Sequence, residues 1–331
     1  MFESILSSKT STRLLFRISR KPYGGVYLNG LAREAKAGVG VTKAALERFY
    51  KQGILLRLTD GNRIVYRLDS ESRLAPELVR LANLDALLGL PEKYQSTINE
   101  FLRRARKCLG DNLSALVVYG SVAKGTAKSG SDIDILLITR EKLGREAEGK
   151  LREALSSASD AFSRLPEEKI MSEASFREGY ELGDDFLANV LRDGIIVHDA
   201  DGYYTRFLMR GVPRATRAMI EKKLETAERW IGSAAESYRK EPLITASLLG
   251  IASIHLSGAF LLLKGVQPGS KHEIPDQLKQ AGEGKFATVY KKAREWEDRQ
   301  PLDIDKERVW EYLSFLREKK NECIRMLQSW R

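Results

Sequence analysis

Residues 113–139 read LSALVVYGSVAKGTAKSGSDIDILLIT, and this stretch decides the fold of the central part of the chain. Its apolar run predicts a buried strand at 116–119, which ends at a turn made by Gly120 and Ser121. Small residues then indicate the start of a short helix, and a second strand is predicted from Ile133. Two strands joined through a helix indicate a domain of mixed α and β structure.

Two aspartates lie at the start of the second predicted strand. Side chains alternate between the two faces of a strand, so Asp132 and Asp134 are expected on one face and Ile133 and Ile135 on the other. Carboxylates this close repel each other, and their burial is unfavourable unless a cation compensates them. Oxygen ligands of this kind suit Mg²⁺ or Mn²⁺, so we expect a divalent metal at this pair.

The turn before the predicted helix supplies groups for a phosphate. Gly120 lets backbone N–H groups approach phosphate oxygens, and Ser121 can donate its hydroxyl to the same oxygens. Lys124 and Ser131 are expected as further contacts to a nucleotide. Beside paired aspartates, this arrangement suits the transfer of a nucleotide from a metal-bound triphosphate.

The same stretch carries a resemblance to a known family. Gly-Ser, ten residues and then Asp-Ile-Asp-Ile resemble the nucleotidyltransferase superfamily that includes DNA polymerase β and kanamycin nucleotidyltransferase, and most of all its minimal branch in prokaryotes. The resemblance implies an NTP substrate, with ATP first, and Mg²⁺ or Mn²⁺ as cofactor. It also implies transfer of NMP to a hydroxyl with release of pyrophosphate, for which Asp132 and Asp134 are catalytic.

The resemblance further implies a third carboxylate from a later strand. Glu168, in a strand predicted at 167–172, is the best-placed acid and is taken as the third catalytic residue, with Glu173 as the alternative. Neither has the apolar neighbours that the family pattern expects. Without a third acid, the domain would bind a nucleotide without turning it over. The following strand, predicted at 195–198, ends at His198, which is interpreted as a surface hydrogen-bonding residue rather than a general base.

The positive charge of the chain is concentrated at its N-terminus. The net charge of the 331 residues is +10. Residues 1–70 hold 13 Lys and Arg against five Asp and Glu, which gives this segment a net charge of +8. Such a concentration favours an anionic partner, with nucleic acid first.

The element order in this basic segment is also informative. It predicts a helix around Leu14, a helix at 28–37, a glycine-rich turn at 38–41, a helix with Thr42 as its N-cap, and a hairpin whose turn contains Gly61. This order resembles a winged helix-turn-helix module, in which the third helix enters the major groove of DNA and the hairpin touches the phosphates. The DNA-binding residues implied are Lys43, Arg48, Lys51, Asn62 and Arg63. Paired half-sites favour a homodimer, and a module used only for dimerisation or protein contacts remains the alternative.

The last third of the chain shows no strand pattern after about Gly211. Helices are predicted at 214–239, 243–264, 274–281, 286–299 and 305–328, which is typical of an up-down bundle. Residues 254–274 are similar to HEPN-type helical domains and to the helical half of kanamycin nucleotidyltransferase. The last helix lacks the Arg and His pair of HEPN ribonucleases, so we expect no RNA cleavage. The domain is expected to shape an acceptor pocket or a dimer interface instead.

The expected fold class is therefore a multidomain α+β chain. A winged helix-turn-helix at 1–70 is followed by a helical connector at 71–109, a nucleotidyltransferase α/β domain with a mixed sheet at 110–210, and an all-α up-down bundle at 211–331. Two cysteines exclude a disulfide scaffold or a Cys-rich zinc site.

One apolar stretch bears on where the protein works. Residues 244–263 contain no Asp, Glu, Lys or Arg, and their length would cross a bilayer. Serine, threonine, glycine and His255 dilute the run, so a buried core helix is expected and no contact with a membrane. The N-terminal segment has no signal-peptide pattern, and a cytoplasmic location is expected.

Two main functions fit these patterns. The first is a metal-dependent nucleotidyltransferase fused to a DNA-binding module. The alternative is a DNA-binding transcription regulator that uses a degenerate nucleotidyltransferase domain as a nucleotide sensor. An antitoxin-like module that modifies a partner is a third interpretation, which the fusion of all parts in one chain weakens.

Overall fold

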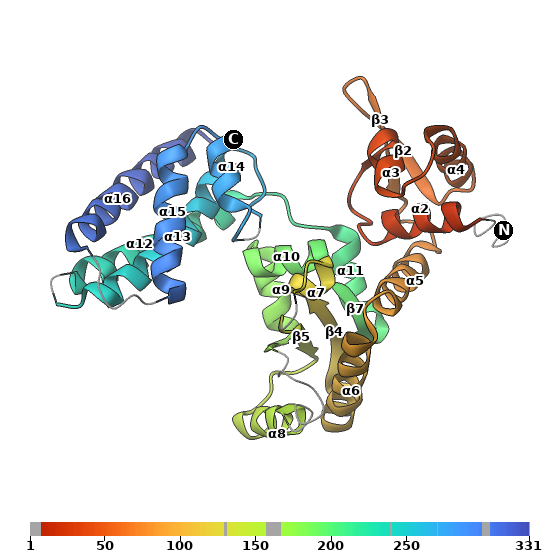
Figure 1. Cartoon of the computed structure of the whole chain (residues 1–331), viewed down its shortest axis with the longest axis horizontal. Helices are drawn as coiled ribbons and strands as arrows, with labels where there is room; N and C mark the ends of the chain where they lie inside the picture. The colour runs from red at the N-terminus through yellow and green to blue at the C-terminus, as the bar shows by residue number, and fades with distance from the viewer. Residues whose placement is uncertain are drawn as a thin grey trace. The chain divides into compact units, whose positions relative to one another are not determined.

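The chain divides into two compact units. A computed structural model describes residues 8–128, 131–156, 167–238, 240–269, 271–299 and 305–330 (Figure 1). The first unit is Met1–Tyr180 with Val190–Pro213, and the second is Glu181–Asn189 with Arg214–Arg331.

The first unit begins with a small helical module closed by a hairpin. Its elements are α2 (Lys9–Ser19), β1 (Val26–Tyr27), α3 (Leu28–Glu34), α4 (Val39–Lys51), β2 (Leu55–Asp60) and β3 (Arg63–Leu68). The strands form an antiparallel sheet in the order β1-β3-β2. Asp60 pairs with Arg63, so the predicted hairpin turn is confirmed. Leu14, Leu15 and Ile18 of α2 are fully buried, as their helical spacing predicts.

The start of α4 differs from the prediction. The helix begins at Val39 after Gly38 as N-cap, so the predicted turn at 38–41 and the N-cap at Thr42 are wrong. Thr42 is buried, and its hydroxyl donates to the Gly38 carbonyl oxygen at 3.0 Å. A glycine inside a helix costs only about 1 kcal/mol, which the packing of the fully buried Phe49 on the same helix exceeds.

The centre of the first unit is a four-stranded mixed sheet, as predicted. Its strands are β4 (Leu113–Tyr119), β5 (Asp134–Thr139), β6 (Glu167–Ser172) and β7 (Ile195–Asp199), in the order β6-β5-β4-β7. β4 is antiparallel to β5 and to β7, whereas β5 and β6 are parallel. The first strand begins earlier and the second begins one residue later than the sequence predicts.

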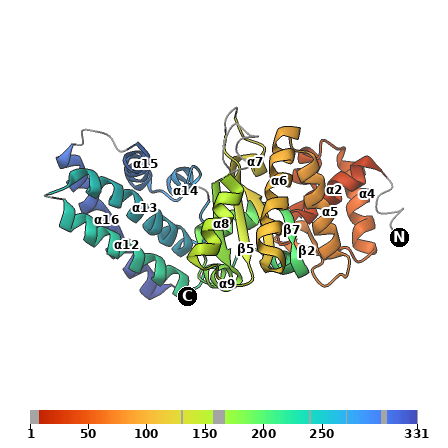
Figure 2. The ribbon, with the colours of Figure 1, turned by 90° about the horizontal axis from the view of Figure 1, so that it is seen from below.

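Further helices precede, connect and follow these strands along the chain. They are α5 (Ala75–Leu88), α6 (Glu92–Leu109), α7 (Gly120–Lys124), α8 (Arg145–Ser156), α9 (Glu173–Glu181), α10 (Asp185–Asp193) and α11 (Tyr203–Arg210). α6 and α8 lie against the sheet (Figure 2). Phe101 of α6 and Leu151 of α8 share one buried cluster with Val118 and Ile135 of the strands. The hydrophobic core beside the sheet therefore includes residues of α6, which the sequence pattern predicts only as part of a connector.

The second unit consists mainly of five helices among its described residues. They are α12 (Arg217–Ser237), α13 (Pro242–Leu263), α14 (Ile274–Gln280), α15 (Gly284–Arg299) and α16 (Lys306–Ser329), close to the predicted ranges. α13 packs on α15 at Gly250, where an added Cβ would lie 2.9 Å from the Ala293 carbonyl oxygen. α13 is long and apolar enough to cross a membrane by length and composition, but 72% of its most apolar window is buried in this structure. Such burial is typical of a core helix.

Candidate functional site

The closest approach in the predicted site joins Gly120 to Asp134. Gly120 follows β4 with φ +70°, and Asp134 begins the neighbouring strand β5, opposite Tyr119. A Cβ built on Gly120 would lie 2.7 Å from Asp134 Cγ and closer still to Oδ2. Only glycine suits this position, since a side chain would meet both an unfavourable backbone conformation and the carboxylate. The Gly-Ser turn and the second aspartate are therefore brought together as the sequence predicts.

Asp132 lies outside the strand. β5 begins at Asp134, so the expectation that both aspartates lie on one strand is corrected. Asp132 is exposed, whereas Ile133 is buried in the same cluster as Ile135. The two carboxylates still flank one buried isoleucine at the end of the strand that lies beside Gly120.

Of the other predicted nucleotide contacts, two have partners within the protein. Ser131 accepts a hydrogen bond on Oγ from the Lys128 N–H at 2.9 Å, which closes a small turn. Lys124, the last residue of α7, forms an ion pair with Asp193 at 3.3 Å. Ser121 is half-buried, and its carbonyl oxygen accepts from the Thr126 N–H at 3.0 Å. No pattern in the sequence identifies Asp193 as a residue near this site.

Glu168 does not join the aspartates, which corrects the expected third carboxylate. In the parallel pairing of β5 with β6, Glu168 lies opposite Ile135. Residues opposite each other share a face of the sheet, so Glu168 lies on the face that carries the buried Ile135. Its carboxylate accepts a hydrogen bond from Arg152 of α8 at 2.5 Å.

The alternative acid, Glu173, lies at the wrong end of the sheet. Its Oε1 accepts a hydrogen bond from the Ser114 hydroxyl at 2.7 Å. Ser114 lies at the start of β4 and Tyr119 ends it, so about 16 Å of strand separates Glu173 from the Gly120 end. The residue that the register places opposite Asp134 is Glu167.

The chemistry of the aspartate pair fits a hard divalent cation that is shared with a substrate. Mg²⁺ is commonly held by one or two carboxylates together with phosphate oxygens and water rather than by a cage of protein ligands. Within the described part of the chain, no group of three or more His, Cys, Asp or Glu residues could hold a metal alone. Asp132 and Asp134 therefore fit a metal that arrives with a nucleotide.

The expected DNA-binding residues divide into two groups. Lys43 and Lys51 are exposed on α4, and Asn62 and Arg63 are exposed at the hairpin turn. Arg48 is turned inward: its guanidinium donates to the Ser11 hydroxyl at 2.6 Å and lies over the Phe49 ring. The expectation that Arg48 contacts DNA is therefore corrected, because it holds α4 to α2.

His198 matches its interpretation as a hydrogen-bonding residue. Its Nδ1 lies 3.0 Å from a guanidinium nitrogen of Arg106. Burial, and after it the positive charge of Arg106, lower the pKa of His198.

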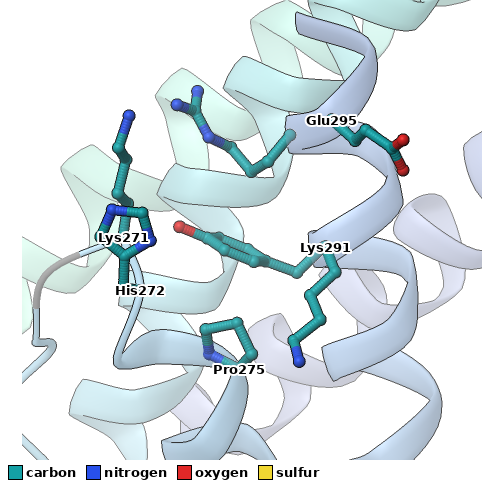
Figure 3. Close-up of a pocket in the computed structure, with 7 residues that line it drawn as sticks. Lys271, His272, Pro275, Lys291 and Glu295 are labelled. Carbon is teal, nitrogen blue, oxygen red and sulfur yellow. The ribbon is translucent and has the colours of Figure 1, made fainter. Parts of the chain in front are cut away.

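The second unit contains a pocket of its own with a volume of about 380 Å³. Lys271 and His272 approach it from the segment before α14, and Lys291 and Glu295 approach it from α15 (Figure 3). Its lining includes three cations, Lys271, Lys291 and Arg294, and one acid, Glu295.

The comparison with protein families gives one match within the first unit. Residues 97–178, about a quarter of the chain, match the nucleotidyltransferase domain. The matched segment runs from α6 to α9 and includes Gly120, Asp132 and Asp134.

One curated relative is similar over a short segment. A putative protein adenylyltransferase of Methanocaldococcus jannaschii is 40% identical over 52 residues, which are 15% of this chain and 35% of that protein. The chain thus covers about a third of that relative's length.

Three solved structures are similar at low scores. Spectinomycin adenyltransferase AAD(9) from Enterococcus faecialis, crystallised with ATP and spectinomycin, has a TM-score of 0.41 and 15% identity over 68% of this chain and 98% of its own. A nucleotidyltransferase-like protein from Exiguobacterium sibiricum has a TM-score of 0.38 and 11% identity over 71% and 78%. A toxin–antitoxin with AMP-PNP has a TM-score of 0.26 and 21% identity over 34% and 81%. TM-scores this low do not establish a shared fold.

Proposed function

We propose that the nucleotidyltransferase domain matched at residues 97–178 transfers an NMP, most readily AMP, from an NTP to a hydroxyl acceptor and releases pyrophosphate. The observation that carries this proposal is the approach of Gly120 to Asp134. It brings a backbone turn able to hold phosphate against a carboxylate able to hold the metal that accompanies phosphate.

Each residue of this site has a separate task in the proposal. The backbone at Gly120 and the Ser121 hydroxyl hold oxygens of the triphosphate. Asp132 and Asp134 would hold a divalent cation, which would supply positive charge beside the phosphate oxygens. The acceptor hydroxyl gives its proton to water, its oxygen bonds to the α-phosphorus, and the bond from this phosphorus to the pyrophosphate oxygen breaks.

The N-terminal module is proposed to bind DNA as part of a homodimer. Lys43 and Lys51 on α4 and Arg63 at the hairpin offer exposed cations to phosphates. The net charge of +8 over residues 1–70 supports this proposal. Fusion to such a module would bring the transferase to a DNA site in the cytoplasm.

Transfer is tested with each of the four labelled NTPs in the presence of Mg²⁺ or Mn²⁺. The acceptors offered are the chain itself, nucleic acid, a protein mixture and small aminoalcohols. The label transferred to each acceptor is measured. Transfer is expected from the wild type and from Asp111→Asn, which removes an exposed carboxylate outside the site. It is expected to disappear in Asp134→Asn. Absence of label on every acceptor, together with absence of metal-dependent NTP binding, would show that the proposal is wrong.

A transcription regulator with a nucleotide-sensing domain is the second candidate. The positions of Glu168 and Glu173, both held by other partners away from Asp134, favour it. It predicts that NTP changes the affinity for DNA, that Asp134→Asn abolishes this response, and that no nucleotide is turned over. Turnover by the wild type would reject this candidate.

A further inference from the structure

A large cavity of the first unit lies beside the aspartate site rather than in it. It has a volume of about 790 Å³ and lies between α2, α3, α5, the last residues of α7 and the end of α10. Gly120, Ser121, Asp132 and Asp134 do not line it. A volume of this order is typical of pockets for small ligands.

The charge of the cavity wall is strongly unbalanced. Its cationic lining consists of Arg13, Arg17, Arg20, Lys21, Lys124 and Arg192. The lining contains only three acids, Glu34, Asp85 and Asp193, so their negative charges balance half of the six positive charges. Like charges brought together around a concave surface repel each other and attract an anion.

One carboxylate in the wall lies within ion-pair distance of three of these cations. Asp193 lies 3.1 Å from Arg192, 3.3 Å from Lys124 and 3.9 Å from Lys21. Only 16% of its side chain is exposed. Of these cations, Lys21 and Lys124 share the one negative charge of Asp193, which cannot neutralise both, so positive charge remains on the wall of the cavity.

Arg20 adds to this excess. Its guanidinium donates to the Gly194 carbonyl oxygen at 3.5 Å, which is a long hydrogen bond. Burial lowers the pKa of Arg20, and the positive charge of Arg17 lowers it further, whereas Asp193 opposes this effect. The charged form of Arg20 would therefore gain from an added anion.

We propose that this cavity binds a small phosphorylated molecule, of the size of a mononucleotide or a short polyphosphate, at a site separate from the aspartate pair. Arginine guanidinium groups and lysine ammonium groups are the side chains that recognise phosphate oxygens best. The cavity walls come from several elements, and no residue of α4 lines it, so it is not the face that we propose for DNA. Binding at this site does not depend on the proposed nucleotide transfer.

The test uses inorganic tripolyphosphate in the presence of EDTA, with the full chain in a calorimeter. Without metal, Asp132 and Asp134 repel the anion, so binding reports the cavity. The wild type is expected to bind, and Arg17→Gln/Lys21→Gln is expected to bind about tenfold or more weakly, because two charged contacts are lost. About half of each side chain is exposed, 46% for Arg17 and 56% for Lys21, so the fold should persist.

The matched control removes the same number of positive charges from the same N-terminal module. Lys9→Gln/Arg33→Gln removes two exposed cations that do not line the cavity and is expected to bind like the wild type. Thermal unfolding of each variant checks its fold. If the double variant is unstable, Arg17→Gln alone is expected to show a smaller thermal shift on adding tripolyphosphate than the wild type shows.

Four results would overturn the proposal. They are absence of tripolyphosphate binding to the wild type, equal weakening in the control variant, loss of binding in Asp134→Asn, and displacement of tripolyphosphate by duplex DNA. The last result would assign the cavity to the nucleic-acid surface of the module. Because the assay contains no metal and no acceptor, failure of nucleotide transfer would not affect its outcome.

Discussion

The substitution Gly120→Ala tests the geometry at the centre of the proposed site. The new Cβ would lie 2.7 Å from Asp134 Cγ, whereas real Cβ atoms essentially never come within 3.0 Å of another heavy atom. The carboxylate must therefore move. A displacement of about 1 Å at a reacting centre lowers the rate by about 100-fold, and we expect a loss of nucleotide transfer of this size.

The backbone contributes a second effect that must be separated from the first. Gly120 has φ +70°, where alanine costs roughly 1–2 kcal/mol of stability. Gly125, at the end of the same helix, also has φ +70°, but nothing lies within 4 Å of its added Cβ. Gly125→Ala therefore carries the same backbone penalty without the contact to Asp134.

The assay compares both variants with the wild type by label transfer, Mg·ATP calorimetry and thermal unfolding. Both are expected to lower the unfolding temperature, and only Gly120→Ala is expected to lose transfer and metal-dependent binding. Equal transfer by the two alanine variants would refute the argument that Gly120 and Asp134 act as one site.

Three further predictions concern other parts of the chain. Glu168→Gln should leave the rate of transfer close to that of the wild type, because Glu168 lies opposite Ile135 and pairs with Arg152 rather than with the aspartates. Transfer rates measure this, and unfolding curves check the fold. Exposed Cys108 should react with iodoacetamide at pH 8. Burial raises the pKa of Cys323 to about 12, so this thiol should stay unmodified until the chain unfolds. Peptide mass spectrometry measures the modification of each cysteine. Lys51→Gln should weaken DNA binding evenly across sequences and reduce the salt slope by about 0.9, and an unchanged slope would contradict a phosphate contact.

The central sheet and its glycine turn could be predicted from sequence because their signals are local. A run of apolar residues that ends at Gly120 identifies β4. The alternation of Asp132, Ile133, Asp134 and Ile135 identifies the two isoleucines as core residues just before and within β5. The close approach of Gly120 to Asp134 follows once the two strands pair.

The position of Glu168 cannot be predicted from the sequence, because the register of β6 depends on pairing between segments far apart in sequence. A shift of one residue moves every side chain to the other face, and the observed register sets Glu168 opposite Ile135. Arg48 was misplaced for a similar reason, since helical spacing cannot show that its long side chain reaches Ser11 of α2. The start of α4 cannot be predicted from the sequence, because Gly38 and Gly40 together suggest a turn.

Calorimetric titration of Mg·ATP into the full chain tests the central claim most directly. The account predicts heat of binding for the wild type and for Asp111→Asn, and its loss in Asp132→Asn/Asp134→Asn when each protein remains folded. Absence of heat with the wild type, or undiminished heat with the double variant, would contradict a nucleotide site built on the two aspartates.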